Sequence, residues 1–150
     1  MNDLKAALVD ALPGTTIIIT SQSNGSTTYN GNTWRGNLNT LDVTQMYMIQ
    51  TNAACEITLN GMPVNPVEHP VAIHNGNNWM AFPLGESMTL SNTFSGFAVN
   101  GDMVISQFGS ATYNGSTWRG ALNTLAPGQG YMYKSNVQGD RTFTFPVSSK

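Results

Sequence analysis

The sequence predicts a mainly β fold made of two tandem copies of a short-strand unit, sandwich-like or barrel-like, each with one short helical segment. The first observation is an internal match at an offset of 84 residues, where 11 of 13 positions are identical between 29–41 and 113–125. The second is a series of short β-branched and aromatic runs separated by Asn-Gly and Pro-Gly turn signals. We expect copy one at 1–66 and copy two at 67–150, as two units or as one pseudo-twofold domain.

Copy one opens with a helix and continues as a series of strands. Leu4, Leu8 and Leu12 recur at helical spacing, with Asn2 or Asp3 as the expected N-cap and Pro13-Gly14 as the end. Two strands are expected on either side of Asn30-Gly31, a dipeptide that favours a type I′ hairpin turn, and two more strands follow them in the copy. The expected strands lie at 16–21, on both sides of Asn30-Gly31 with the second at 34–38, and at 46–50 and 56–59; Cys55 is expected to be buried.

Copy two repeats this order and adds a strand in front. Its expected segments are a weak helix at 87–96, strands at 103–107, around the Asn114-Gly115 hairpin, at 118–122, 131–134 and 142–145. The added opening strand is 78–84, in which we expect Trp79 to pack in the core with Phe82. Copy one has no counterpart of this strand. Either the chain is part of a longer tandem array, or the strand completes one two-copy domain. The proline-rich stretch 61–70 connects the copies.

Two motifs of copy two resemble a known repeat. They are Asn78-Trp79-Met80-Ala81-Phe82-Pro83-Leu84 and Leu125-Ala126-Pro127-Gly128-Gln129-Gly130-Tyr131. The pattern resembles a tandem repeat of secreted multidomain surface proteins from Bacteroidetes and related bacteria, which opens W-N-W-I-S-F-P-L and closes L-x-P-G-x-G-Y. The resemblance implies export, an accessory β-rich module and no catalytic role. Residues 80 and 81 depart from the opening motif, and copy one lacks the Pro-Gly-x-Gly turn.

Composition narrows the class of partner. Only 9% of the residues are charged and the net charge is −2, whereas Asn, Thr, Ser and Gly together make 61 of the 150 residues. Six scattered basic residues cannot form an electrostatic footprint for phosphates, so we expect no nucleic-acid partner. No apolar run reaches the 18 to 20 residues that a membrane helix needs, and the N-terminus carries no signal peptide. We therefore expect no membrane partner; a location outside the cell or at its surface is what the resemblance implies.

The search for catalytic and metal sites finds none. No carboxylate recurs at equivalent positions in the two copies, and no nucleophile lies beside an evident base. His69 and His74 flank Pro70, with Glu68 as the only nearby third ligand, so surface histidines are favoured over a metal site. Gly128-Gln129-Gly130 is too short for a phosphate loop. We expect no enzyme, no cofactor and no metal.

The residues that recur in both copies are aromatic or basic. Sugars present flat C–H faces that stack on exposed Trp and Tyr, and hydroxyls that bond to Arg and Asn. The competing interpretation is that each Trp is a core residue, because a repeat must keep its packing residues. Trp34 and Leu38 share one strand face, which favours the core interpretation for the Trp pair, and Arg35 points to the other face. The outward arginines are then the better site candidates, and the alternative for them is a salt bridge or packing across a neighbouring strand. The candidate ligand-binding residues are Arg35, Arg119, Trp34, Trp118, Tyr29 and Tyr113.

These features favour a non-catalytic extracellular accessory module that binds a polysaccharide or surface glycan. Its further partners would be the neighbouring domains of a longer chain. The alternative is a structural spacer or adhesion repeat with no ligand of its own. Exposure of the Tyr and Trp side chains on one surface distinguishes the two.

Overall fold

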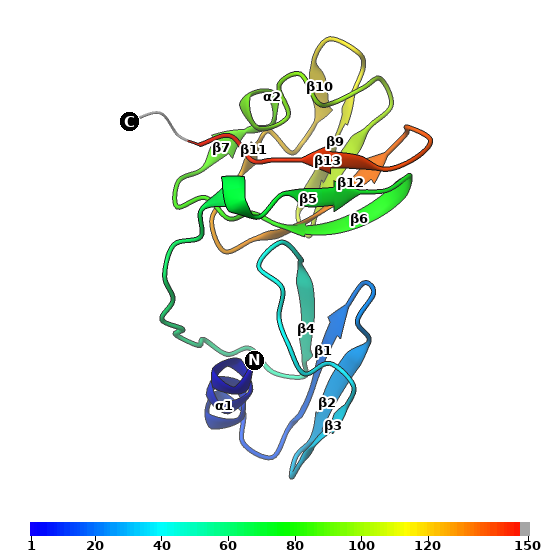
Figure 1. The fold of residues 1–150 in the computed structure, drawn as a ribbon. Helices are drawn as coiled ribbons and strands as arrows, with labels where there is room; N and C mark the ends of the chain where they lie inside the picture. The colour runs from blue at the N-terminus through cyan, green and yellow to red at the C-terminus, as the bar shows by residue number, and fades with distance from the viewer. Residues whose placement is uncertain (148–150) are drawn as a thin grey trace. The chain divides into compact units, whose positions relative to one another are not determined.

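The computed structural model describes residues 1–147 and confirms a mainly β, sandwich-like fold, with 36% strand and 12% helix. The chain divides into two compact units (Figure 1). Unit 1 holds Met1–Asp42 and Tyr47–Met62, and unit 2 holds Val43–Met46 and the described residues from Pro63 on. Within the described part of the chain, neither length nor hydropathy allows any helix to span a bilayer.

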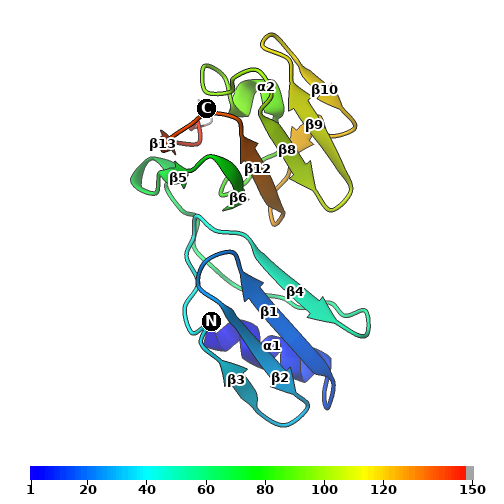
Figure 2. The same ribbon diagram turned by 90° about the vertical axis from the view of Figure 1, so that its right-hand side faces the viewer.

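Unit 1 is a helix packed on one face of an antiparallel sheet (Figure 2). The strand order is β3-β2-β1-β4, and the elements are α1 (Asn2–Ala11), β1 (Thr16–Ser21), β2 (Ser26–Asn30), β3 (Trp34–Gly36) and β4 (Tyr47–Thr51). The leucine stripe of α1 packs against the inward isoleucines of β1, and the buried set is Leu4, Leu8, Leu12, Ile17, Ile19, Tyr29 and Leu38. The predicted helix cap is wrong: the N-cap is Met1 without a side-chain bond, so Asn2 and Asp3 both lie in the first turn.

The two Asn-Gly hairpins form, but not with type I′ turns. That turn needs a positive φ at both central residues, and no residue other than glycine has one in 1–147. Instead the Asn30 side-chain oxygen accepts the amides of Asn32 and Thr33, at 3.1 and 2.9 Å. Asn114 holds Ser116 and Thr117 in the same way, at 3.1 and 2.8 Å. An asparagine side chain that bonds to the backbone two and three residues on closes a four-residue loop in which only the glycine, Gly31 or Gly115, has a positive φ.

The hydrogen bonds of the Asn114 side chain are expected to stabilise unit 2. Asn114→Ala should lower the free energy of unfolding by about 1 kcal/mol, because two backbone amides lose their acceptor but remain open to water. Urea denaturation followed by tryptophan fluorescence measures the change. Ser116→Ala is the matched control in the same loop and should change stability by less than about 0.5 kcal/mol. Equal effects of the two substitutions would refute the role given to the Asn114 side chain.

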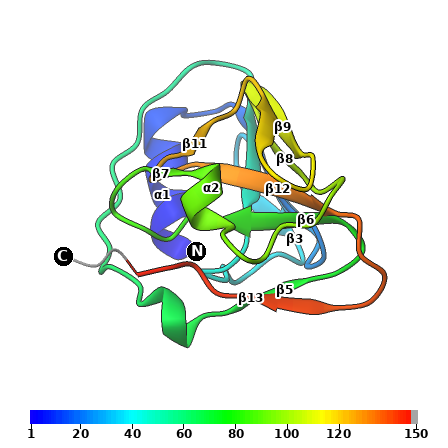
Figure 3. The same ribbon diagram turned by 90° about the horizontal axis from the view of Figure 1, so that it is seen from above.

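Unit 2 is larger and contains three sheets (Figure 3). The main sheet has the order β10-β9-β8-β12-β6, built from β6 (Gly76–Ala81), β8 (Met103–Ser106), β9 (Gly109–Tyr113), β10 (Trp118–Gly120) and β12 (Gly130–Ser135). Two small antiparallel pairs join β5 (Val71–Ile73) to β13 (Arg141–Phe143) and β7 (Met88–Thr89) to β11 (Thr124–Leu125). The helix α2 (Leu90–Thr93) is much shorter than the predicted 87–96 and is capped by the Thr89 side chain.

The core of unit 2 is rich in aromatic rings. Phe94 lies 4.9 Å from both Tyr133 and Phe143, measured between ring centroids, and Phe143 lies 4.8 Å from Phe145. Phe82 and Met80 are also buried there. Trp79 was expected in this core and is not: successive side chains of β6 alternate in face, so Met80 takes the inward place and Trp79 stays half-buried.

The segment between the units differs from the prediction. Residues 56–59 form no strand, and Cys55 is exposed, not buried. Between β4 and β5 the only regular element is the short 3₁₀ helix η1 (Pro66–Glu68), which begins after Asn65. The apolar alternation of 56–59 is therefore not accompanied by pairing with any strand in the described residues.

The matching stretches of sequence adopt matching positions in their sheets. The sheet order in unit 1 is β3-β2-β1-β4, and the corresponding strands of unit 2 stand in the matching order β10-β9-β8-β12. Tyr29 lies opposite Trp34, as Tyr113 lies opposite Trp118. The hydroxyls of Tyr47 and Tyr131 accept amides 84 residues apart, from Asp42 at 2.7 Å and from Ala126 at 2.8 Å. The repeated hairpins thus share their strand pairing, whereas the repeated Thr-Leu pair does not: Thr124–Leu125 forms β11 and Thr40-Leu41 forms no strand.

Candidate ligand-binding site

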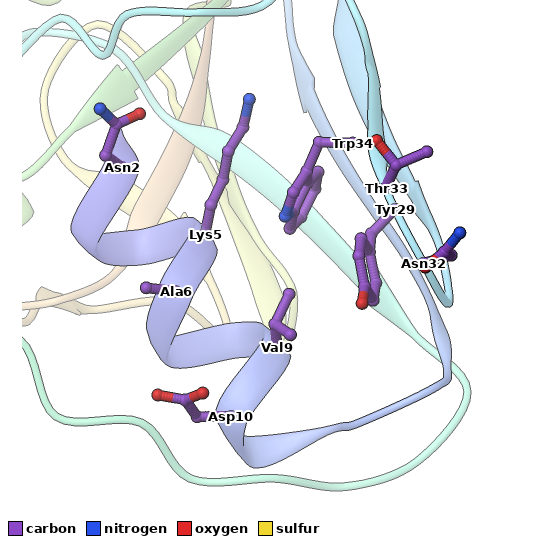
Figure 4. Close-up of a pocket in the computed structure, with 9 residues that line it drawn as sticks. All are labelled: Asn2, Lys5, Ala6, Val9, Asp10, Tyr29, Asn32, Thr33 and Trp34. Carbon is purple, nitrogen blue, oxygen red and sulfur yellow. The ribbon is translucent and has the colours of Figure 1, made fainter.

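An open hollow of about 530 Å³ lies on unit 1 between α1 and the β2–β3 hairpin (Figure 4). This volume is in the range of small-molecule sites. Its wall combines one large aromatic surface with amide, hydroxyl, ammonium and carboxylate groups. The lining residues are Asn2, Lys5, Ala6, Val9, Asp10, Tyr29, Asn32, Thr33 and Trp34.

The helix side of the hollow comes from one stripe of α1. Asn2, Lys5, Ala6 and Val9 are spaced at i, i+3, i+4 and i+7, which places them on one helical face beside the buried leucines. The Lys5 ammonium nitrogen lies 5.2 Å from the centroid of the Trp34 ring. At this distance the cation is attracted by the ring quadrupole, so Lys5 adds a positive group at the edge of the aromatic wall.

The strand side comes from the hairpin. Trp34 begins β3 and pairs with Tyr29 of β2, and their ring centroids are 5.3 Å apart at an interplanar angle of 36°. Both rings point toward the helix in Figure 4. Tyr29 is buried, whereas Trp34 is only half-buried. The loop bonds of Asn30 fix the backbone of Asn32 and Thr33 at the rim, so the polar part of the wall is held in place before any ligand arrives.

The second aromatic pair has a different neighbour. Tyr113 and Trp118 repeat the 5.3 Å contact and both are half-buried. Where Trp34 has Lys5 beside its ring, Trp118 has Phe94, with 5.7 Å between the ring centroids. Both Trp side chains therefore pack against the core of their own unit, and Trp34 in addition borders the polar groups of the hollow. Identical sequence motifs thus produce one Trp in a mixed polar hollow and one against an aromatic core.

The two predicted arginines lie elsewhere. Arg35 and Arg119 are exposed, on the strand face opposite to the neighbouring Trp, and lie across from Thr28 and Thr112. Within residues 1–147 neither side chain makes a hydrogen bond or ion pair, so the salt bridge weighed above does not form there. The structure thus brings together Tyr29 with Trp34 and Tyr113 with Trp118, but it does not place an arginine in the hollow.

The histidines of the connection show ordinary surface contacts. His74 Nδ1 lies 2.7 Å from Asp140 Oδ1, with both side chains exposed. The amide of Asn65 donates to Glu68 at 2.9 Å. In the part of the chain that the structure describes, no three His, Cys, Asp or Glu side chains gather as a metal site would require.

A buried carboxylate in unit 2 was missed by the sequence analysis. Asp102 is fully buried, and Arg141 donates from one terminal nitrogen to Asp102 Oδ2 at 3.0 Å. The Tyr133 hydroxyl donates to the same oxygen at 2.5 Å, and the amides of Val99 and Asn136 donate at 3.0 and 2.7 Å. The Arg141 guanidinium also lies 4.2 Å from the Phe97 ring centroid. We call Asp102, Arg141 and Tyr133 the buried carboxylate cluster.

Electrostatics fix the charge state of this cluster. Burial by itself raises the pKa of Asp102, but the hydrogen bonds from Tyr133, Asn136, Val99 and Arg141 outweigh it and hold the pKa below its usual value. The pKa of Tyr133 is raised, first by burial and then by the hydrogen bond to Asp102. The aspartate is therefore ionised and the tyrosine neutral near pH 7. Every bond to the carboxylate comes from its own unit, which indicates a structural role.

The sequence therefore predicts only part of the hollow beside Trp34 and does not predict the buried carboxylate cluster. Lys5 and Asn2 carry a usable signal, their helical spacing beside the leucine stripe, but Asp102 has no counterpart in copy one, and nothing in the sequence indicates its burial. The comparisons with known proteins add no further assignment. Neither family models, nor curated proteins, nor solved structures give a match to this chain.

Proposed function

We propose that this chain is a non-catalytic module that binds a neutral carbohydrate in the hollow beside Trp34. The single observation that carries the proposal is a half-buried indole that forms one wall of an open hollow in which polar side chains lie beside the apolar Ala6 and Val9. A sugar ring offers two surfaces, an apolar C–H face and a rim of hydroxyls. The hollow offers a partner for each.

The stacking partner is the indole of Trp34, which the Tyr29 ring supports from within the hairpin. Candidate hydrogen-bonding groups surround it. The amides of Asn2 and Asn32 both donate and accept, the Thr33 hydroxyl does the same, and Asp10 accepts. A chain with 9% charged residues and a net charge of −2 suits a neutral ligand better than a polyanion.

The arginines stay a separate prediction. Arg35 and Arg119 are exposed and point away from the aromatic face, so they do not contact a sugar held in the hollow. Their contribution would require a ligand long enough to continue around the β3 or β10 edge. Arg35→Ala is therefore expected to weaken binding less than a substitution of Trp34.

A spacer or adhesion repeat is the second candidate. The observation that favours it is the contact of Trp118 with Phe94, because it shows that the repeated Trp can serve packing alone. In both candidates we propose that the module works outside the cell or at its surface, next to other domains of a longer chain. The resemblance to secreted surface-protein repeats and the charge-poor composition support this location.

Affinity gel electrophoresis in a panel of neutral polysaccharides tests the proposal. We expect at least one polysaccharide to retard the chain, and Trp34→Ala to weaken that retardation roughly tenfold, the equivalent of about 1.4 kcal/mol. Trp34→Phe keeps a ring against Tyr29 and should retain part of the binding. Trp118→Phe is the matched control, because its ring lies against Phe94, and should bind as the original chain does.

Two results would contradict the proposal. The first is no retardation by any polysaccharide in the panel, which would favour the spacer. The second is retardation that Trp34→Ala leaves unchanged although circular dichroism shows the variant to be folded. If Arg35→Ala abolishes binding while Trp34→Ala does not, the site lies on the opposite face of the sheet.

A further inference from the structure

The outer edge of β4 is an unpaired sheet edge. In the described residues β4 pairs with β1 alone, and it ends the order β3-β2-β1-β4. Its side chains are Tyr, Met, Ile, Gln and Thr, of which Met48 is 52% exposed and Ile49 43% exposed. Native edge strands are usually protected by lysine, proline or a covering segment. β4 has neither a charge nor a proline, so its open edge is suited to pairing with another strand.

Unit 2 shows what occupies the same edge there. β12 corresponds to β4 in the sheet order, and β6 pairs with its outer side over six residues, from Gly130 opposite Ala81 to Ser135 opposite Gly76. Tyr133 is fully buried, with Phe94 and Phe97 against its ring and β6 paired along its strand, whereas the corresponding Ile49 is exposed. Met132 is half-buried, although the corresponding Met48 is exposed. The edge that lacks a six-residue pairing partner, that of β4, is therefore also the edge at which these two positions are exposed.

The register of that pairing defines the missing strand. In unit 2, Met80 lies opposite Tyr131, Trp79 opposite Met132 and Asn78 opposite Tyr133. Transferred to unit 1, the same strand would set an apolar side chain beside Tyr47 and an indole beside Met48. An asparagine would lie opposite Ile49. In unit 2 the Asn78 amide donates to the Tyr133 carbonyl at 3.2 Å, so this residue also ties the strand to its neighbour.

We propose that the β4 edge of unit 1 binds an extended strand of the β6 type, donated in antiparallel orientation by the opening segment of a further copy of this module. Backbone hydrogen bonds would supply the affinity, and the alternating side chains the selectivity, as in other cases of strand addition. The consequence is that successive modules are linked through a shared sheet. This inference does not depend on the carbohydrate site, because Trp34 lies in β3 at the other edge of the sheet.

Hydrogen exchange on the full chain tests the proposal, with a synthetic peptide of residues 74–84 as the probe. We expect the peptide to slow exchange of alternate β4 amides, with no change in β3. The matched peptide with Met80→Asp should lose at least tenfold in affinity, because it would place a carboxylate in the core beside Tyr47. Met48→Lys and Ile49→Lys should weaken binding of the unchanged peptide by a similar factor, and both positions are exposed enough to keep the fold.

A second version keeps the test decisive if the free peptide binds too weakly to detect. Residues 74–87 are attached in front of Met1, which raises the effective concentration to the order of millimolar. We expect β4 amides to be protected in this fusion and not in the fusion that carries Met80→Asp. Exposure of β4 in both fusions would overturn the proposal. Protection of β4 in the original chain without peptide, rising with protein concentration and unchanged by added peptide, would assign the edge to direct β4 pairing between two copies of this chain and not to a donated opening segment, and would also overturn it.

Discussion

Replacing Asp102 by alanine is expected to lower the free energy of unfolding of unit 2 by about 3–5 kcal/mol, the usual effect of breaking a buried ion pair from one side. The substitution leaves Arg141, which is mostly buried, without its carboxylate. It also leaves the Tyr133 hydroxyl and the amides of Val99 and Asn136 without an acceptor. Urea denaturation with fluorescence and near-ultraviolet circular dichroism measures the loss.

The matched control is Asp140→Ala. Asp140 also contacts a basic side chain, His74 at 2.7 Å, but both groups are exposed, so this substitution should have almost no effect. Asp102→Asn should lie between the two, since it keeps an acceptor oxygen and removes the charge. If Asp102→Ala and Asp140→Ala behave alike, the buried carboxylate cluster does not stabilise the unit.

The same cluster predicts a pH dependence. The folded state lowers the pKa of Asp102, so its ionised form is favoured by folding. This contribution is fully present above the unfolded pKa of about 3.9 and is lost as the pH falls through the lower folded value. We therefore expect acid unfolding of unit 2 below about pH 4. Asp102→Asn should remove most of this dependence.

The second large effect is expected for Gly120→Ala in the repeated Trp-Arg-Gly motif. Gly120 has a φ of +147°, and a Cβ there would meet the Ser110 carbonyl oxygen and the Ala111 Cα, both on the neighbouring β9 backbone. Backbone atoms cannot move aside as a flexible side chain can. The substitution combines left-handed strain with overpacking, so we expect a loss of about 3 kcal/mol or more in the free energy of unfolding.

Gly36→Ala should behave in the same way in unit 1, where φ is +135° and the added Cβ would meet Ser26 and Thr27. Gly128→Ala is the control: its φ is also positive, at +75°, but nothing lies within 4 Å of the added atom. Thermal unfolding separates strain from collision. Similar losses for Gly120→Ala and Gly128→Ala would show that close approach of the strands contributes little.

The sequence was sufficient for the fold class and for most strands because these depend on local patterns. The run from Thr16 to Ser21 is β-branched, and β1 occupies those residues. The leucine spacing placed α1 to within a residue at its end. Turn chemistry was only half predicted. The Asn-Gly pairs correctly indicated the hairpins. The loop geometry differs from the predicted turn because the Asn30 side chain accepts the backbone amides of Asn32 and Thr33.

What the sequence could not supply was pairing across long separations. The strand expected at 56–59 has the right alternation and no partner, while β5 forms because β13 pairs with it from 70 residues away. Asp102 is likewise defined by Arg141 and Tyr133, which are distant in the chain. For the candidate site, the aromatic wall could be predicted from the repeated Tyr and Trp. The polar wall on α1 required knowledge of which helical face meets the hairpin.

The claim that Trp34 contacts a carbohydrate is tested most directly by the indole N–H signals in a ¹H–¹⁵N spectrum of the full chain. The chain has three tryptophans, and Trp34→Phe and Trp118→Phe assign their signals. On titration with oligosaccharides of a polysaccharide that retards the chain, the Trp34 signal is predicted to shift in a saturable way while those of Trp79 and Trp118 stay in place. A Trp34 signal that does not move at saturating ligand, or that moves no more than the signal of Trp118, would contradict the account.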